Sequence, residues 1–114
     1  GAFSSLYHVK NNKLTEIAGS RFTVGTLIKN KPTFELHTIS ISPGDSIYLS
    51  TDGYQDQFGG PRFKKFKKNN FNNTLEETSM LPIVKQRNAL NDIVEKWRGK
   101  NPQIDDILVL GIVF

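Results

Sequence analysis

The sequence has 114 residues and a net charge of +4, because fifteen Lys and Arg face eleven Asp and Glu. This length corresponds to one domain, and a hydrophobic content of 37% is sufficient for a core. The absence of cysteine excludes disulfides, thiolate zinc sites and cysteine nucleophiles, and two histidines are too few to favour an imidazole metal site. No apolar run reaches the roughly 20 residues that span a bilayer. We therefore expect a cytoplasmic domain without a membrane segment, in which any metal is bound by oxygen ligands.

The first half of the sequence predicts β-strands. Apolar residues alternate in two short runs on either side of Lys10-Asn11-Asn12-Lys13, which is typical of a hairpin. A later run changes its apolar parity near His37, which indicates a bulge or a change of buried face. Ser42-Pro43-Gly44-Asp45 is a strong turn signal. The expected strands are 6–9, 14–17, 34–41 and 46–51, with Ile47 and Leu49 on one face of the last.

The second half changes to a helical period. Thr74, followed by Glu77 three residues later, predicts a capping box and a helix start. A clearer helix spans 83–98 and ends at Gly99. Residues 107–114 are almost continuously apolar, which predicts a strand near the middle of a sheet with both faces buried. Strands, then helices, then a last strand indicate the α+β class. The apolar face of the helix is expected to contain Ile83, Leu90, Ile93, Val94 and Trp97.

Acidic residues occupy two expected strand ends. Asp52 follows the strand 46–51, and Gly53 allows a sharp turn behind it. Asp105 and Asp106 precede the final strand. If the two strands are neighbours, these carboxylates meet at one rim of the sheet, where they would bind a hard divalent cation. The alternative is ordinary turn chemistry, since Asp-Gly after a strand is common in turns.

The basic run from Lys64 to Lys68 contains Phe66 and follows Phe63. Aromatic residues among lysines can suit single-stranded nucleic acid. More often this pattern is a solvated helix face with apolar anchors, and no wider basic patch supports nucleic-acid binding. We therefore expect no nucleic-acid partner.

Residues 44–60, GDSIYLSTDGYQDQFGG, resemble the central motif of bacterial serine phosphatases of the sporulation stage II protein E and RsbU type, within the metal-dependent PPM protein phosphatases. Further matches are Lys64-Lys65-Phe66, the stretch from Gln86 to Gly99, and Gln103-Ile104-Asp105-Asp106-Ile107. The early Gly1-Ala2-Phe3 and Leu6-Tyr7 fit the strands before that motif, so the resemblance covers essentially the whole chain. It implies the C-terminal portion of an α/β/β/α sandwich, with mostly antiparallel strands and helices packed on one side.

The resemblance also implies a chemistry. Intact domains of this kind bind two Mg²⁺ or Mn²⁺ ions, and the match places Asp52 and Asp105 among the metal ligands, with Asp106 as the weaker candidate. Gly53 would supply the backbone turn. A metal-activated water would hydrolyse phosphoserine or phosphothreonine, so no catalytic residue beyond the metal ligands and no covalent phosphoenzyme is expected. No residue is assigned to substrate binding.

The sequence departs from the family pattern at its start, because nothing in it matches the family's other metal-binding Asp or its Asp-Gly-His-Gly-like motif. Residues 1–114 are therefore interpreted as the C-terminal fragment of a single phosphatase domain. We expect the fragment alone to be inactive. We also expect it to self-associate through exposed sheet edges.

Partners follow from the resemblance alone. They are a phosphorylated protein substrate, such as an anti-anti-sigma-like regulator of bacterial sigma-factor signalling, and an upstream sensor or signalling region. An alternative function is a non-catalytic phosphatase-like binding or adaptor module that uses the basic residues Lys64 to Lys68. A third is a purely structural β-rich domain with no response to metal.

Overall fold

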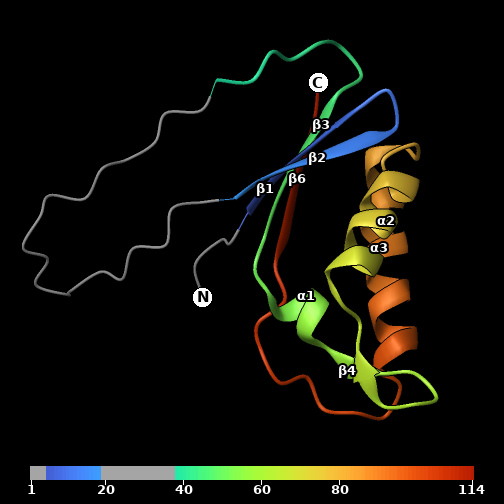
Figure 1. The fold of residues 1–114 in the computed structure, drawn as a ribbon. Helices are drawn as coiled ribbons and strands as arrows, with labels where there is room; N and C mark the ends of the chain where they lie inside the picture. Colours follow the sequence, from blue (N-terminus) through green and yellow to red (C-terminus); the bar gives the residue numbers. More distant parts are fainter. Residues whose placement is uncertain (1–4, 19–37) are drawn as a thin grey trace, which may run out of the picture.

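The computed structural model describes residues 5–18 and 38–114, which form a mixed α/β arrangement with one main antiparallel sheet (Figure 1). This confirms the α+β class. No helix in these ranges combines the length and apolar character needed to cross a membrane. The elements, in chain order, are β1 Ser5–Lys10, β2 Lys13–Ala18, β3 Ser46–Ser50, α1 Gly53–Asp56, β4 Phe58–Gly59, β5 Lys64–Lys65, α2 Lys68–Thr78, α3 Ile83–Arg98 and β6 Val109–Val113.

The main sheet has the strand order β2-β1-β3-β6, and every neighbouring pair is antiparallel. The predicted hairpin between β1 and β2 is confirmed, and its turn places Asn11 and Asn12 at φ 52° and 62°. Two consecutive positive φ values are typical of the turn that matches strand twist, and asparagine tolerates them well. The predicted turn before β3 is also confirmed, since the Asp45 amide donates to the Ser42 carbonyl at 3.0 Å.

Helices α2 and α3 lie together on one side of the sheet (Figure 1). Aromatic rings fill the layer between them, with Tyr54 and Phe71 edge to face at 4.9 Å between centroids. A buried hydrogen bond crosses the layer, from the Tyr48 hydroxyl on β3 to Gln86 Oε1 on α3 at 2.6 Å. Because an unpaired buried amide is costly, this bond fixes where α3 meets the sheet. The core consists of Tyr7, Val9, Tyr48, Tyr54, Phe66, Phe71, Leu75 and Val94.

The helices confirm one prediction and correct two details. Helix α3 spans Ile83–Arg98 as expected, and Gly99 ends it at φ +56°. Ile83 is exposed, however, and Gln86 is the buried residue of the first turns. The predicted helix start at Thr74 is wrong, because α2 begins at Lys68. Thr74 lies inside that helix, where its hydroxyl donates to the Asn70 carbonyl at 2.7 Å.

Among the described strands, the last one does not take the central position that the sequence predicts. Strand β6 pairs only with β3 among the described residues, so it forms an edge of the sheet as described. Helices cover one face of this strand, and Leu110 and Ile112 on the other face are each 48% exposed. The strand expected over 34–41 is not formed at 38–41, and residues 34–37 lie outside the described residues.

The open face of the sheet predicts self-association. Ile47 pairs with Ile112 and Leu49 with Leu110, so apolar side chains line the face opposite the helices. We expect the molar mass from light scattering to rise with concentration, because an apolar edge strand can pair with a second copy. Ile112→Lys should shift the chain toward monomer, whereas Met80→Lys, at an exposed position beyond α2, should not. A clean monomer for the unaltered chain at high concentration would contradict this.

The hydrogen bonds of the Asp45 carboxylate predict that the folded protein loses stability in acid. Its Oδ2 lies 2.9 Å from His8 Nε2 and accepts from the Ser42 amide at 3.1 Å, and these hydrogen bonds lower the pKa of Asp45 below its ordinary 3.8. The stabilisation of the folded state by Asp45 is therefore complete above the ordinary pKa of 3.8. It is lost as the pH falls through the lowered pKa of the folded state. Urea unfolding at pH 7 and pH 2 should show a smaller acid loss for Asp45→Asn than for the unaltered chain. Asp92→Asn, an exposed helix position, should behave like the unaltered chain.

Candidate metal centre

A buried threonine joins the two acidic segments. Thr51 follows β3 and is 7% exposed. Its amide donates to the Leu108 carbonyl at 3.0 Å, and its hydroxyl donates to the Asp106 carbonyl at 2.8 Å. The Leu108 amide in turn donates to the Thr51 hydroxyl at 3.1 Å. We call these contacts the Thr51 junction; they continue the β3–β6 pairing beyond both strand ends and place Asp52 beside the segment that carries Asp106.

Gly53 packs directly against the same segment. A Cβ atom at this position would lie 2.1 Å from the Asp106 carbonyl oxygen and 2.7 Å from its carbon. Gly53 is not among the described glycines with positive φ, which are Gly44, Gly60 and Gly99. The requirement for glycine therefore comes from close backbone approach, and not from the sharp turn that the sequence suggested.

Helix α1 anchors this corner to the helical layer. The Tyr54 hydroxyl donates to the Leu90 carbonyl on α3 at 2.7 Å. Burial raises the pKa of Tyr54, so the phenol remains a protonated donor at neutral pH. The Asp56 amide donates to the Asp52 carbonyl at 3.0 Å and closes the single turn of α1. Asp52 is therefore attached to a fixed backbone, although its own side chain faces solvent.

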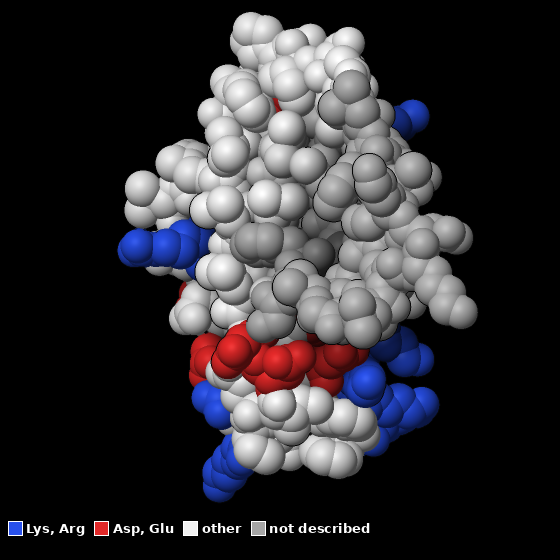
Figure 2. All heavy atoms as spheres, turned by 90° about the vertical axis from the view of Figure 1, so that its left-hand side faces the viewer, with Lys and Arg blue, Asp and Glu red and all other residues white. Residues whose placement is uncertain are grey.

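The three predicted carboxylates, Asp52, Asp105 and Asp106, are all exposed. Asp52 Oδ1 accepts from Gln55 Nε2 at 3.3 Å, and Asp105 Oδ1 accepts from the Asp106 amide at 2.7 Å. Figure 2 shows acidic side chains gathered in one band, at the height of α1 and of the segment before β6, with Lys and Arg at its margins.

Lys68 is the cation held near this band. It forms an ion pair with Glu16 of β2, and this hydrogen bond is the main cause that raises the pKa of Lys68. Asp52 contributes in the same direction, which places it within electrostatic reach of the ammonium group. The carboxylate paired with Lys68 is therefore that of Glu16.

The carboxylate oxygens of Asp52, Asp105 and Asp106 match the preference of Mg²⁺ and Mn²⁺ for oxygen ligands. Within residues 5–18 and 38–114, however, no three carboxyl or imidazole groups stand close enough to form a metal-binding cluster. His8 of β1 lies beside the other end of β3, where it contacts Asp45. The structure thus brings Asp52, Gly53 and Asp106 to one rim through backbone contacts, with Asp105 next to them.

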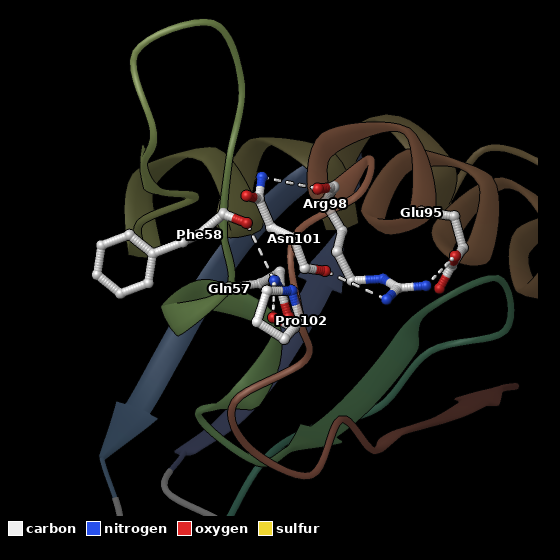
Figure 3. Close-up of polar contacts among 6 residues, drawn as sticks. All are labelled: Gln57, Phe58, Glu95, Arg98, Asn101 and Pro102. Atoms are coloured by element: carbon white, nitrogen blue, oxygen red, sulfur yellow. Dashed lines mark hydrogen bonds and ion pairs between the residues drawn. The ribbon is translucent and has the colours of Figure 1, made fainter.

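A second support, which the sequence analysis missed, holds the chain that leads to Asp105 (Figure 3). Gln57 is fully buried, and its Nε2 donates to the carbonyls of Phe58 and Pro102, each at 3.0 Å. Asn101 and Arg98 close the turn after α3, since Asn101 Nδ2 donates to the Arg98 carbonyl at 2.9 Å. A glutamine and a threonine give no periodic signal, although a hydroxyl residue directly before Asp52-Gly53 could have indicated Thr51.

The model of the family described as Stage II sporulation protein E (SpoIIE) matches residues 3–114. The chain belongs to this family. It is also similar to the solved structure of the SiaA-PP2C domain of Pseudomonas aeruginosa, with 30% sequence identity and a TM-score of 0.83. That similarity covers 96% of this chain and 42% of the other, so the chain spans less than half of that structure. No curated protein matches the sequence significantly.

Family membership confirms the resemblance on which the sequence analysis relied. It places the chain with PP2C-like protein phosphatase domains, and the matching fold agrees with the predicted arrangement of antiparallel strands with helices on one side. The roles of Asp52, Asp105 and Asp106 remain predictions, because the comparisons concern family and fold.

The Thr51 junction can be tested by removing one oxygen atom. Thr51→Val leaves the Asp106 carbonyl and the Leu108 amide without their partner, and should lower the free energy of unfolding by about 1–2 kcal/mol. Chemical shifts of residues 105–108 should move with it. Thr51→Ser retains the hydroxyl and should leave those shifts nearly unchanged. A larger loss of stability in Thr51→Ser than in Thr51→Val would show that the methyl group, and not the hydrogen bonds, supports the rim.

Proposed function

We propose that this chain forms part of a metal-dependent phosphoserine/phosphothreonine protein phosphatase. The observation that carries the proposal is the Thr51 junction, which holds the segments of Asp52 and Asp105-Asp106 at one rim of the sheet in a member of a phosphatase family. Carboxylates gathered on a rigid edge and open to solvent can reach both a hard cation and a phosphate group.

Asp52 and Asp105 would hold Mn²⁺ or Mg²⁺. In the intact domain this would be part of a binuclear centre. When bound, such ions lower the pKa of a water molecule and stabilise the charge of the transferring phosphoryl group. The structure favours a positioning role for Asp106, because its carbonyl oxygen receives the Thr51 hydroxyl and contacts Gly53. Gly53 permits this close approach, and Tyr54 fixes α1 against α3.

Two or three carboxylates cannot complete a binuclear centre. We therefore propose that residues 1–114 are the C-terminal part of one phosphatase domain and that this part alone has little activity. Its substrate would be a phosphorylated protein of the anti-anti-sigma kind, and an upstream signalling region would control it in the bacterial cytoplasm. Family membership favours this function over a non-catalytic adaptor or a purely structural domain.

The metal hypothesis predicts which backbone amides Mn²⁺ will broaden. In a titration of ¹⁵N-labelled chain, we expect selective loss of signals around Asp52–Gly53 and Asp105–Asp106 together, because paramagnetic broadening detects even a weakly held ion near both strand ends. Asp52→Asn and Asp105→Asn should each weaken the effect at both segments, and EDTA should restore the signals.

Asp92→Asn is the matched control, since it removes an exposed carboxylate from α3. Its broadening pattern should equal that of the unaltered chain. Signal loss scattered over all surface carboxylates, or absent from the rim, would remove the support for a metal at this position.

A further inference from the structure

The chain concentrates its positive charge in one segment. Residues 57–75 contain five Lys and Arg and no Asp or Glu, whereas the rest of the chain contains ten basic and eleven acidic residues. The basic run from Lys64 to Lys68 was predicted as a solvated helix face, but Lys64 and Lys65 form strand β5 and only Lys68 begins a helix. Strand β5 pairs with β4 in a two-stranded hairpin. The net charge of the protein is therefore carried by the β4–β5 hairpin and the start of α2.

The base of this hairpin is fixed against the only tryptophan of the chain. The Gly60 amide donates to the Trp97 carbonyl at 3.0 Å, and Trp97 Nε1 donates to the Gln57 carbonyl at 2.9 Å. A Cβ atom on Gly59 would lie 1.9 Å from the Trp97 carbonyl oxygen, and one on Gly60 would lie 2.6 Å from the indole ring. Such close contact makes the hairpin a rigid projection from α3.

The end of the projection carries a stacked aromatic pair, in which Phe63 is exposed and Phe58 is half-buried. The Phe63 amide donates to the Gly60 carbonyl at 3.3 Å, which closes a turn, and Phe63 has φ +49°. Its ring stacks on Phe58 at 5.1 Å between centroids, and Lys65 Nζ lies 5.9 Å from the Phe58 centroid. We call Phe58, Arg62, Phe63, Lys64 and Lys65 the hairpin tip.

Phe63 combines two unfavourable features. It is 59% exposed, and its left-handed backbone costs about 1 kcal/mol or more for a residue other than glycine. Glycine or asparagine would remove both costs. An exposed aromatic side chain on a strained backbone, next to basic residues, is typical of a ligand-binding or protein-binding surface.

Helix α1 links the hairpin tip to the rim that carries Asp52. Lys65 Nζ lies 3.6 Å from Asp56 Oδ1 at the end of α1, and α1 begins directly after Asp52. A partner seated on the tip would therefore extend toward the carboxylates that the proposed phosphatase uses.

We propose that the hairpin tip is a docking surface for an acidic polypeptide segment that carries an apolar side chain. Carboxylates or phosphates of the segment would pair with Arg62 and Lys64, and its apolar side chain would pack on the free face of Phe63. The identification of this segment with the phosphoprotein substrate rests on the proposed function; binding by the tip does not.

The tip suits a peptide better than single-stranded nucleic acid. Nucleic-acid surfaces of that kind offer successive aromatic rings on which bases stack. Here Phe58 and Phe63 cover each other, and Lys65 lies near the Phe58 ring, so one ring face at most is free.

Fluorescence anisotropy with the full chain tests this directly. The probe is a fluorescein-labelled peptide of alternating Glu and Phe around a central phosphoserine, together with the same peptide containing serine and an oligodeoxythymidine of similar length. We expect peptide binding at low salt that weakens with added NaCl. Phe63→Asn should weaken it about fivefold, and Arg62→Gln with Lys64→Gln should weaken it to a similar extent. Lys85→Gln with Lys100→Gln, two exposed charges outside the tip, is the matched control.

Each outcome decides the proposal. Binding lost in the tip variants and kept in the control supports it, and the serine peptide then shows whether carboxylates suffice or phosphate is required. No peptide binding, equal effects of tip and control variants, or tighter binding of the oligonucleotide overturns it. Phe63→Asn removes strain, so misfolding does not explain its loss of binding. The Mn²⁺ titration on the same sample separates the two proposals, since peptide binding without metal proximity at the rim contradicts the phosphatase alone.

Discussion

The hydroxyl of Thr51 is the contact on which the candidate site depends. It donates to one carbonyl and accepts from one amide of the segment before β6, and it does so where the regular pairing of β3 and β6 has ended. Without it, only the Thr51 amide bond to the Leu108 carbonyl and the contact of Gly53 with Asp106 would join the two acidic segments. The hydrogen bonds are strong here because Thr51 is buried and both partners would otherwise be left unpaired. Gly53 allows the second close contact at the same place.

Local sequence patterns were sufficient to predict an element where the apolar residues were periodic or where a turn motif was present. The hairpin of β1 and β2, the turn before β3, and the length of α3 with its Gly99 end were all predictable in this way. Asp52, Gly53, Asp105 and Asp106 were also located by their positions at strand ends, although only the structure shows that Gly53 is needed for backbone contact with Asp106.

The remaining features depend on tertiary contacts that have no local signature. Thr74 matches a helix start, yet α2 begins earlier because Phe71 and Leu75 pack in the core on the same helix. Strand β6 has the composition of a central strand, and the described part of the chain covers only one of its faces. Gln57 and Gln86 are buried polar residues whose partners lie far away in sequence, so their roles appear only when those partners are known.

The fold thus places opposite charges on neighbouring elements joined by the single turn of α1. Acidic groups lie at its beginning, where the metal would bind, and basic groups lie beyond its end on a hairpin fixed to Trp97. An acidic partner would be repelled by the rim alone and attracted by the hairpin beside it. The two proposals are linked physically by this arrangement, and each can be tested without the other.

The central claim is that one cation is held by both strand ends. A double-mutant cycle of Mn²⁺ affinity over Asp52→Asn, Asp105→Asn and the double variant tests this most directly, because ligands of one ion do not act independently. The account predicts that either single change removes most of the affinity and that the double variant loses little more. Additive losses, with two separately saturable sites, would show that the acidic segments bind ions independently and would contradict a shared metal centre.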